Sequence, residues 1–518
     1  MRKYLIFTVF ISGMVSLAVE MAASRLLGNY FGASNLIWAV IIGLILIYLT
    51  AGYFLGGRWA DNSPKFSTFY RILIWSGFLV GSIPLISRPI LRMAANAFDE
   101  LALGGMIGAF ITVLILFSAP IILMGTASPF AIRLSLHDSR HAGRIAGKIY
   151  AISTLGSFLG TFLPGLILIP LIGTFRTFVA IGGLLLLVAL VGLWLSEGFL
   201  PVLPWIWMPV VLIILAILGT RGSDKTSQGL VYETESAYNY IQVLEQYGYT
   251  LLRLNEGQGI HSIYNPSILN YYGPWEQVSI APFFNPAPYD PSKVQRAAIL
   301  GLAAGTTARQ LTAVYGNDII VDGFEIDPKI VAVAEKYFGM TESNLNVFIQ
   351  DGRTGLHSSP YQYQIISVDA YRPPYIPWHM TTVEFFQMVH DHLTNDGVMV
   401  INVGRMDTDR RLIDGLTGTI RQVFPSVHVV DLPDAYNTLL FATVQPSNTS
   451  NLMDNYSWLQ LQKDIHPLLL ETMQSALSNI QPTPQLNIVY TDDVAPIELI
   501  TNEMILSYLF TPLLGTRP

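Results

Sequence analysis

The chain has 518 residues, of which 51% are hydrophobic, and it contains no cysteine, so disulfides, thiolate nucleophiles and cysteine-based zinc sites are excluded. Its formal net charge of −7 is unevenly distributed: residues 1–219 carry 13 Lys and Arg against 6 Asp and Glu (net +7), and the remainder carries 16 against 30 (net −14). A region with a net charge of −14 repels nucleic-acid phosphates and attracts cations such as amines. The same charge could instead serve only to keep this part of the chain soluble. We therefore expect no nucleic-acid partner.

The N-terminal part consists of long apolar stretches, which predict a multi-span α-helical membrane domain over residues 1–220. Each stretch has about 18 residues or more, enough to cross the roughly 30 Å hydrocarbon core of a lipid bilayer. About seven spans are expected, at residues 4–23, 36–54, 69–86, 104–132, 145–172, 175–195 and 202–218. Small residues within them would let helix backbones approach closely, as at Gly156, Gly160 and Gly165.

The distribution of Lys and Arg between the loops indicates how the spans are oriented. The loops on one side hold Arg2, Lys3, Arg58, Lys65, Arg71, Arg133, Arg140, Arg144 and Lys148. The loops on the other side hold Arg25, Arg88, Arg92 and Arg176. Because basic loops stay in the cytoplasm, we expect a multi-pass protein of the cell membrane with a cytoplasmic N-terminus. Seven spans would place the rest of the chain outside, away from a cofactor made in the cytoplasm, so the side of the soluble part stays open.

Residues 229–290 are predicted to form a small β unit followed by a connector. Short runs rich in Tyr, Ile, Val and Leu occupy residues 229–264, with turn residues at Gly248 and at Glu256 and Gly257. A proline-rich stretch then leads into a different pattern.

From about residue 291 the pattern becomes strand, glycine turn and helix, which predicts a parallel sheet flanked by helices. In the first repeat a strand at residues 297–300 precedes a turn from Gly301 to Gly305, and a helix follows at residues 306–315. Glycines permit a tight turn and the close approach of a ligand to the N-terminus of that helix.

Acidic residues end the next three predicted strands. Glu325 lies at the end of the second strand, 20 residues after the glycine turn, where an acid can accept both hydroxyls of a ribose. Asp351 and Gly352 follow the third strand, and Asp369 follows the fourth. Because the C-terminal ends of neighbouring parallel strands converge on one crevice, we expect these residues and the glycine turn to line a single site.

After a fifth strand at residues 398–403, two runs at residues 427–431 and 438–444 predict a closing β-hairpin. Such a hairpin is typical of S-adenosylmethionine-dependent folds rather than of NAD-binding domains, so the pattern favours a sulfonium nucleoside over NAD. The predicted fold over residues 291–446 is an α/β Rossmann-like domain of the class I methyltransferase type, and residues 447–518 are expected to form a C-terminal helical extension.

Three motifs resemble those of the spermidine synthase (polyamine aminopropyltransferase) family. Residues 235–243, Glu-Ser-Ala-Tyr-Asn-Tyr-Ile-Gln-Val, match that family's opening Glu-Ser-x-Tyr-Gln-x-Ile-x-Val, with Asn239 in place of the glutamine. Residues 325–327 match its ribose-binding Glu-Ile-Asp, and residues 351–352 match its adenine-contacting Asp-Gly. The resemblance covers about residues 233–405, and the fusion to membrane spans resembles membrane-anchored bacterial members of the family.

The resemblance implies a transferase of polyamine biosynthesis that moves an aminopropyl group from decarboxylated S-adenosylmethionine to an amine. The cofactor contacts that it implies are Asn239, Gly301, Gly305, Glu325 for the ribose, and Asp351 with Gly352 for the adenine. Asp369 matches the aspartate that helps to deprotonate the attacking amine, and Tyr272 is the expected substrate-side phenol. His261, His357 and His379 are scattered without metal-ligand spacing, so no metal is expected. A homodimer is a further expectation, because dimers are common among the relatives.

Two positions depart from the family pattern. The glycine turn holds Ala303 and Ala304 where the family has an aspartate that contacts the cofactor. Arg372 stands three residues after Asp369, where the family has a second aspartate, and a fixed cation there would repel a diamine by about 1–4 kcal/mol at contact distance. Residues 369–379 are rich in aromatics and prolines, which is typical either of a lid over an amine or nucleoside or of a loop packed against the membrane domain.

These departures leave two alternatives open. In the first, the domain binds S-adenosylmethionine itself and transfers a methyl group, because the loss of the loop aspartate and the gain of Arg372 suit a cofactor that keeps its carboxylate. In the second, the chain is a non-catalytic sensor or transporter, in which a bound polyamine or nucleoside biases the membrane bundle.

Overall fold

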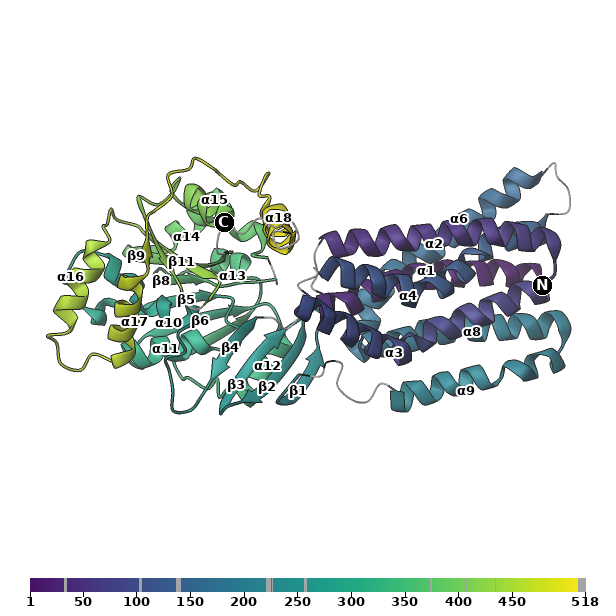
Figure 1. The fold of residues 1–518 in the computed structure, drawn as a ribbon, viewed down its shortest axis with the longest axis horizontal. Helices are drawn as coiled ribbons and strands as arrows, with labels where there is room; N and C mark the ends of the chain where they lie inside the picture. The colour runs from purple at the N-terminus through teal and green to yellow at the C-terminus, as the bar shows by residue number, and fades with distance from the viewer. Residues whose placement is uncertain are drawn as a thin grey trace. The chain divides into compact units, whose positions relative to one another are not determined.

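The computed structural model describes residues 1–31, 35–101, 105–136, 141–219, 225, 227–255, 259–372, 375–406, 409–433 and 435–510 (Figure 1). By compactness the chain forms two units, one of Met1–Ser227 with Glu235–Tyr240 and the other of Gln228–Thr234 with Ile241–Pro518. Several residues named in the predictions lie outside the described residues, namely Gly104, Arg140, Glu256 and Gly257, and the prolines at positions 373 and 374.

The first unit is built from helices that follow the predicted apolar stretches. They are α1 (Arg2–Phe31), α2 (Asn35–Asn62), α3 (Phe66–Leu101), α4 (Gly105–Gly125), α5 (Ala127–Ser135), α6 (Ala142–Leu163), α7 (Ile169–Ile172), α8 (Thr174–Glu197) and α9 (Trp207–Ile214). Shorter helical turns cover Pro164–Leu168, Leu200–Trp205 and Leu215–Gly219. Within the described residues, seven helical segments are long and apolar enough to cross a membrane by length and composition, which equals the number of predicted spans.

Glycines bring α1 and α6 together backbone to backbone. Gly156 and Gly160 are buried on α6, and a Cβ atom at either position would collide with the carbonyl group of Phe10 or of Met14 on α1. The prediction of close packing is therefore confirmed for these two glycines. It is wrong for Gly165, whose Cβ position has nothing within 4 Å.

The contrast between these glycines allows a stability test. Gly160→Ala should lower the melting temperature of the detergent-solubilised protein, because the added methyl group collides with α1 and overpacking costs about 1–3 kcal/mol. Gly165→Ala is the matched control and should leave the melting temperature unchanged or raise it, because its methyl group enters open space. The measurement is the temperature dependence of the far-ultraviolet circular dichroism. Equal melting temperatures for the two variants would contradict the close packing of α1 and α6.

A four-stranded sheet opens the C-terminal part, as the predicted small β unit requires. Its strands are β1 (Leu230–Glu235), β2 (Tyr240–Gln246), β3 (Tyr249–Leu254) and β4 (Ile260–Tyr264), in that spatial order. Strand β3 pairs antiparallel with both β2 and β4. Tyr247 and Gly248 form the two-residue turn between β2 and β3, and both have positive φ, 52° and 83°, as a tight hairpin turn matched to the strand twist requires.

An eight-stranded sheet forms the centre of the second unit, in the order β12-β10-β11-β9-β8-β5-β6-β7. Its strands are β5 (Arg296–Leu300), β6 (Ile320–Glu325), β7 (Leu345–Ile349), β8 (Tyr363–Val368), β9 (Leu393–Gly404), β10 (Ser426–Asp431), β11 (Asn437–Thr443) and β12 (Ile480–Gln481). Strands β5 to β9 pair in parallel, whereas β11 pairs antiparallel with both β9 and β10. This order is the Rossmann-like, methyltransferase-type arrangement with the predicted closing hairpin.

Helices cover both faces of this sheet. Successive residues of β5 point to opposite faces, so that Ala297 and Ile299 join one buried cluster while Ala298 and Leu300 join another. The helices that contribute to the first cluster are α11 (Thr306–Tyr315), α12 (Pro328–Tyr337), α16 (Ser450–Leu459) and α17 (Pro467–Ser478). Those that contribute to the second are α13 (Gly352–Ser358), α14 (Val383–Asp391), α15 (Arg411–Ile420) and α18 (Ile497–Phe510). Because both faces are covered, a site has to form at the ends of the strands.

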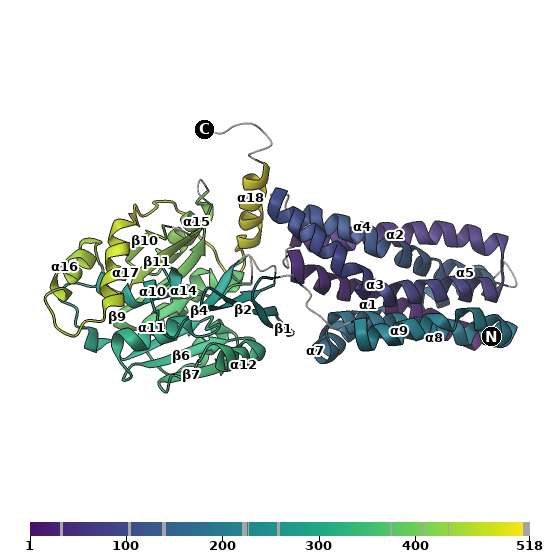
Figure 2. The same ribbon diagram turned by 60° about the horizontal axis from the view of Figure 1, so that its bottom comes forward.

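The C-terminal extension contains a strand as well as the predicted helices. Besides α16, α17 and α18 it supplies β12, which pairs antiparallel with β10 and extends the sheet by one strand. Helix α17 also lies beside the short helix α10 (Pro274–Gln277), as both ribbon views show (Figures 1 and 2).

Candidate active site

The parallel strands end at one edge, and the predicted site residues follow these ends. Leu300 of β5 pairs with Phe324 of β6 and with Val368 of β8, and Glu325 of β6 pairs with Ile349 of β7. The residues that come next along the chain, which include the glycine turn and the predicted acids, therefore emerge at the same edge of the sheet.

The glycine turn lies against the end of β8. Gly301 has a φ of 98°, and a Cβ atom there would lie 2.5 Å from the carbonyl oxygen of Asp369. Gly305 has a φ of 80° and stands directly before α11. Both positions therefore need glycine, the first because of close approach as well as backbone conformation.

The backbone amides of this turn all have protein acceptors, from Gly301 through Gly305. The acceptors lie at 2.9–3.0 Å and are the carbonyl oxygens of Leu302 and Phe324, the Glu325 carboxylate and the Ser262 hydroxyl. A turn that cradles a pyrophosphate offers such amides to the ligand instead. The arrangement therefore suits a nucleoside without phosphates better than a dinucleotide.

Glu325 joins the glycine turn to the start of α12. Its Oε2 atom accepts from the Ala303 amide at 2.9 Å, and its Oε1 atom accepts from the Asp327 amide at 3.0 Å. Burial raises the pKa of Glu325 to about 7, and the two amides oppose this rise. The carboxylate thus has a fixed orientation at the edge, where the resemblance places a ribose.

Asp351 caps the N-terminus of α13 and has two donors. Its Oδ1 atom accepts from the Thr354 amide at 3.0 Å, and its Oδ2 atom lies 3.1 Å from His379 Nε2. The hydrogen bond to His379 is the main reason that the pKa of Asp351 falls to about 2, and burial opposes that fall. Asp351 is therefore ionised at neutral pH, as an acceptor for an adenine amino group should be.

A turn near the C-terminus, at residues 491–494, holds His379 in place through Arg353. Arg353 donates to the His379 carbonyl oxygen at 2.7 Å and makes two further bonds to the Asp492 carboxylate, at 2.7 and 2.6 Å. Asp492 also accepts from the Thr382 hydroxyl at 2.7 Å. Sequence reasoning missed this relay, because Arg353 and Asp492 are 139 positions apart and no local pattern connects them.

Asp369 is oriented by two asparagines. Asn402 Nδ2 donates to Asp369 Oδ1 at 2.9 Å, and Asn437 Nδ2 donates to Asn402 Oδ1 at 2.8 Å. Desolvation raises the pKa of Asp369 to about 6, and the bond from Asn402 opposes the rise. Sequence reasoning missed both asparagines, although a polar residue inside the apolar run of β9 was a signal for Asn402, which is 7% exposed.

The described part of the aromatic segment 369–379 is attached to the edge of the sheet. The Tyr371 hydroxyl donates to the Asn402 carbonyl at 2.9 Å and accepts from the Gly404 amide at 3.0 Å. Arg372 is exposed, and its backbone exchanges hydrogen bonds with Tyr375 at 2.8 and 2.9 Å. Among the described residues, no group of three or more His, Asp or Glu side chains could hold a metal ion.

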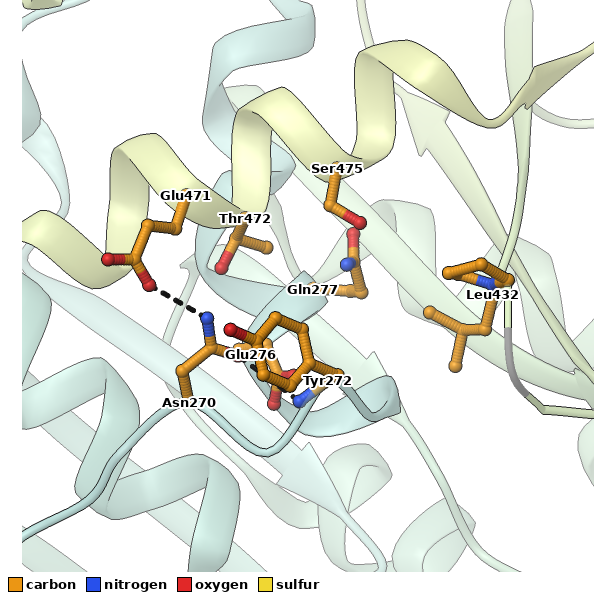
Figure 3. Close-up of a pocket in the computed structure, with 9 residues that line it drawn as sticks. Asn270, Tyr272, Glu276, Gln277, Leu432, Glu471, Thr472 and Ser475 are labelled. Atoms are coloured by element: carbon orange, nitrogen blue, oxygen red, sulfur yellow. Dashed lines mark hydrogen bonds between the residues drawn. The ribbon is translucent and has the colours of Figure 1, made fainter.

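Two predicted site residues, Asn239 and Tyr272, do not follow the ends of the parallel strands. Asn239 belongs to the segment grouped with the first unit, where its amide donates to the Ser236 hydroxyl at 2.8 Å. Within that unit Glu235, the first residue of the family motif, accepts from Arg25 Nε at 3.0 Å and from the Thr174 amide at 3.0 Å. Tyr272 lines a pocket whose lining residues include none of the predicted cofactor contacts (Figure 3).

Known proteins with similar sequences include polyamine aminopropyltransferases and, over 137 to 168 residues, eEF1A lysine and N-terminal methyltransferases of mouse and human at 29% identity. A family model for the spermine/spermidine synthase domain matches residues 290–455. The chain is 32% identical over 285 residues to a probable polyamine aminopropyl transferase of Bifidobacterium longum, a match that covers 52% of this chain and 62% of that protein. It is 26% identical over 307 residues to a polyamine aminopropyltransferase of Vibrio vulnificus, covering 57% of this chain and 96% of that protein. A solved spermidine synthase of Thermotoga maritima is similar over 48% of this chain and 84% of its own, with 18% identity and a TM-score of 0.39.

The family match lies within the second unit. The chain spans less than two thirds of the Bifidobacterium relative and nearly all of the Vibrio relative. Both relatives are named as aminopropyl transferases, which are transferase enzymes. The C-terminal region of the chain therefore carries a spermine/spermidine synthase domain.

Proposed function

We propose that this chain is a membrane-anchored polyamine aminopropyltransferase that uses decarboxylated S-adenosylmethionine and an amine as its two substrates. The observation that carries the proposal is the common edge of the sheet, where Glu325 ends β6, Asp351 follows β7 and Asp369 follows β8, and each acid has different donors. The names of the relatives support the same reaction.

In the proposed reaction, the amine nitrogen attacks the propyl carbon next to the sulfonium sulfur. The new bond joins nitrogen to carbon, the carbon–sulfur bond breaks with its electron pair passing to sulfur, and methylthioadenosine leaves. Asp369 accepts the proton that the amine has to lose. A carboxylate whose pKa is raised to about 6 suits this role, because it is a stronger base than an ordinary aspartate and is still mostly ionised at neutral pH.

The glycine turn favours the decarboxylated cofactor over S-adenosylmethionine. A cofactor carboxylate needs hydrogen-bond donors, and the amides from Gly301 through Gly305 already donate to protein acceptors. Methyl transfer remains the second candidate, and Ala303 and Ala304 favour it, because the family's loop aspartate would repel a cofactor carboxylate and these residues do not.

The proposal for the first unit is that its seven long apolar segments anchor the enzyme as a multi-pass protein of the cell membrane. The excess of Lys and Arg in one set of loops supports a cytoplasmic N-terminus. A homodimer is proposed only by analogy with the relatives.

The role of Asp369 can be tested by Asp369→Asn. We expect turnover with decarboxylated S-adenosylmethionine and a panel of amines to fall by about 10²–10⁴-fold, because the general base is lost. Binding of methylthioadenosine, measured by calorimetry, should not change. Asp318→Asn, at an exposed position, is the control and should keep full turnover.

Three results would count against this role or this reaction. Full turnover by Asp369→Asn would show that Asp369 does not act as the general base. If the unmodified protein released S-adenosylhomocysteine from S-adenosylmethionine, the reaction would be methyl transfer and not aminopropyl transfer. Tight nucleoside binding without turnover of any amine would favour a sensor or transporter.

The pH dependence of the reaction provides a second test. Because Asp369 has to be ionised to accept a proton, kcat at saturating amine should rise with pH through about 6 and then level off. Asn402→Ala removes a hydrogen bond that favours the ionised form, so the rise should move to higher pH. Asn317→Ala, at an exposed position, should leave the profile in place. A profile in Asn402→Ala that matches that of the unmodified protein would contradict the proposed coupling.

The C-terminal turn should affect cofactor binding through Arg353 and His379. Asp492→Asn weakens the paired bonds to Arg353, so the affinity for methylthioadenosine should fall by about five-fold, the effect of an exposed ion pair of about 1 kcal/mol. Asp493→Asn changes the neighbouring exposed carboxylate and should have no effect. Calorimetry on both variants makes the comparison, and equal affinities would show that the turn is not coupled to the adenine aspartate.

A further inference from the structure

A pocket between α10 and α17 lies outside the cofactor site described above. Its lining comes from three separate parts of the chain: the segment around α10, the residues after β10, and one face of α17 (Figure 3). Its cavity volume is about 20 Å³, which is room for one water-sized group.

The described lining of the pocket includes two glutamates, besides amide and hydroxyl groups that can both donate and accept hydrogen bonds. Glu276 on α10 is 1% exposed, with Oε1 accepting from the Gly273 amide at 2.6 Å and Oε2 accepting from Gln310 at 3.1 Å. Glu471 on α17 is exposed and accepts from Asn270 Nδ2 at 2.8 Å. None of the described residues that line the pocket is Lys, Arg or His. Burial raises the pKa of Glu276 to about 7, and a cation beside it would favour its ionised form. Two carboxyl groups without a cationic side chain in the described lining therefore favour a positively charged ligand.

Gln277 is a second and independent sign of a ligand. Its side chain is buried, with 3% exposure, and its Oε1 atom has no hydrogen-bond partner among the described residues. In Figure 3 the side chain extends from α10 towards Ser475 on α17. A buried acceptor without a donor costs about 1–3 kcal/mol, and a ligand that donates hydrogen bonds would remove this cost.

An ammonium group matches these features. It carries a positive charge and three donors, and the lining offers the carboxyl groups of Glu276 and Glu471 and the Oε1 atom of Gln277 as acceptors. The exposed ring of Tyr272 adds an aromatic face at the same pocket, and aromatic faces attract cations.

The pocket and Asp369 lie along the same edge of the sheet. Strand β10 runs parallel to β9, because β11 pairs antiparallel with both, so Leu432 after β10 lies at the same edge as Asp369 after β8. The order β8-β9-β11-β10 puts three strand spacings between them, about 14 Å. Hydrogen bonds through Asn402 and Asn437 link Asp369 to Leu432. The last link is the carbonyl oxygen of Asn437, which accepts from the Leu432 amide at 3.0 Å.

We propose that this pocket binds the distal ammonium group of a polyamine with three or more nitrogens, while another nitrogen of the same molecule reaches Asp369. The inference rests on the proposed aminopropyl transfer and adds the acceptor class to it. A four-carbon diamine is too short to occupy both places, so the pocket selects longer amines.

Two variants test the pocket. Glu471→Gln removes a charge and keeps an acceptor for Asn270, so the Kd for the triamine spermidine should rise by about five-fold, which corresponds to about 1 kcal/mol. The Kd for 1,4-diaminobutane and for methylthioadenosine should not change. Gln277→Met removes the acceptor that has no protein partner, so spermidine affinity should fall without a fall in melting temperature. Glu335→Gln, at an exposed position on α12, is the charge-matched control.

Calorimetry and turnover assays on the same preparations separate the two proposals. If the protein transfers aminopropyl groups but both pocket variants bind spermidine as the unmodified protein does, the pocket proposal is overturned and the proposed function stands. If turnover is absent but spermidine binding weakens in both variants, the pocket proposal stands and the proposed function is overturned. The pocket proposal would also be overturned if the two variants bound the diamine and the triamine with equally reduced affinity. It would be overturned as well if the unmodified protein bound no amine.

Discussion

The Glu325 carboxylate, held by the amides of Ala303 and Asp327, is the constraint on which the site depends. It joins the turn after β5 to the end of β6 and to the start of α12. Ala303 has a φ of 49°, a left-handed conformation that costs energy for a residue with a side chain, so its bond to Glu325 helps to stabilise a strained turn. The same turn brings Gly301 against the Asp369 backbone, which fixes the position of the turn relative to Asp369.

The acids at this edge differ because their surroundings differ. Burial raises the pKa of Glu325 and of Asp369, whereas the bond to His379 lowers the pKa of Asp351. A lowered pKa suits an acceptor that stays ionised, and a raised pKa suits a group that has to take a proton. One edge of a sheet can therefore supply binding and proton transfer from the same type of side chain.

Two kinds of electrostatic attraction would act on the proposed amine substrate, one at long range and one at contact. The part of the chain after residue 219 has a net charge of −14, which draws cations towards it whatever the local geometry. The acceptors around Glu276 and Glu471 act only at contact and only on a group of the right shape. Arg372, which replaces a family carboxylate, lies exposed, so solvent weakens its repulsion of a cationic substrate.

The sequence by itself determined the elements and the order of the acids. Strand and helix periods, the glycines at positions 301 and 305, and the acids after successive strands are local signals, and the rule that parallel strands share one C-terminal edge places those acids together. Only the tertiary structure decided which side chains set the properties of those acids. His379 on Asp351 and Asn402 on Asp369 meet their partners, and Asp492 meets Arg353, through packing between segments that are far apart along the chain. No short-range pattern encodes such pairs, because each depends on how layers of the fold come into contact.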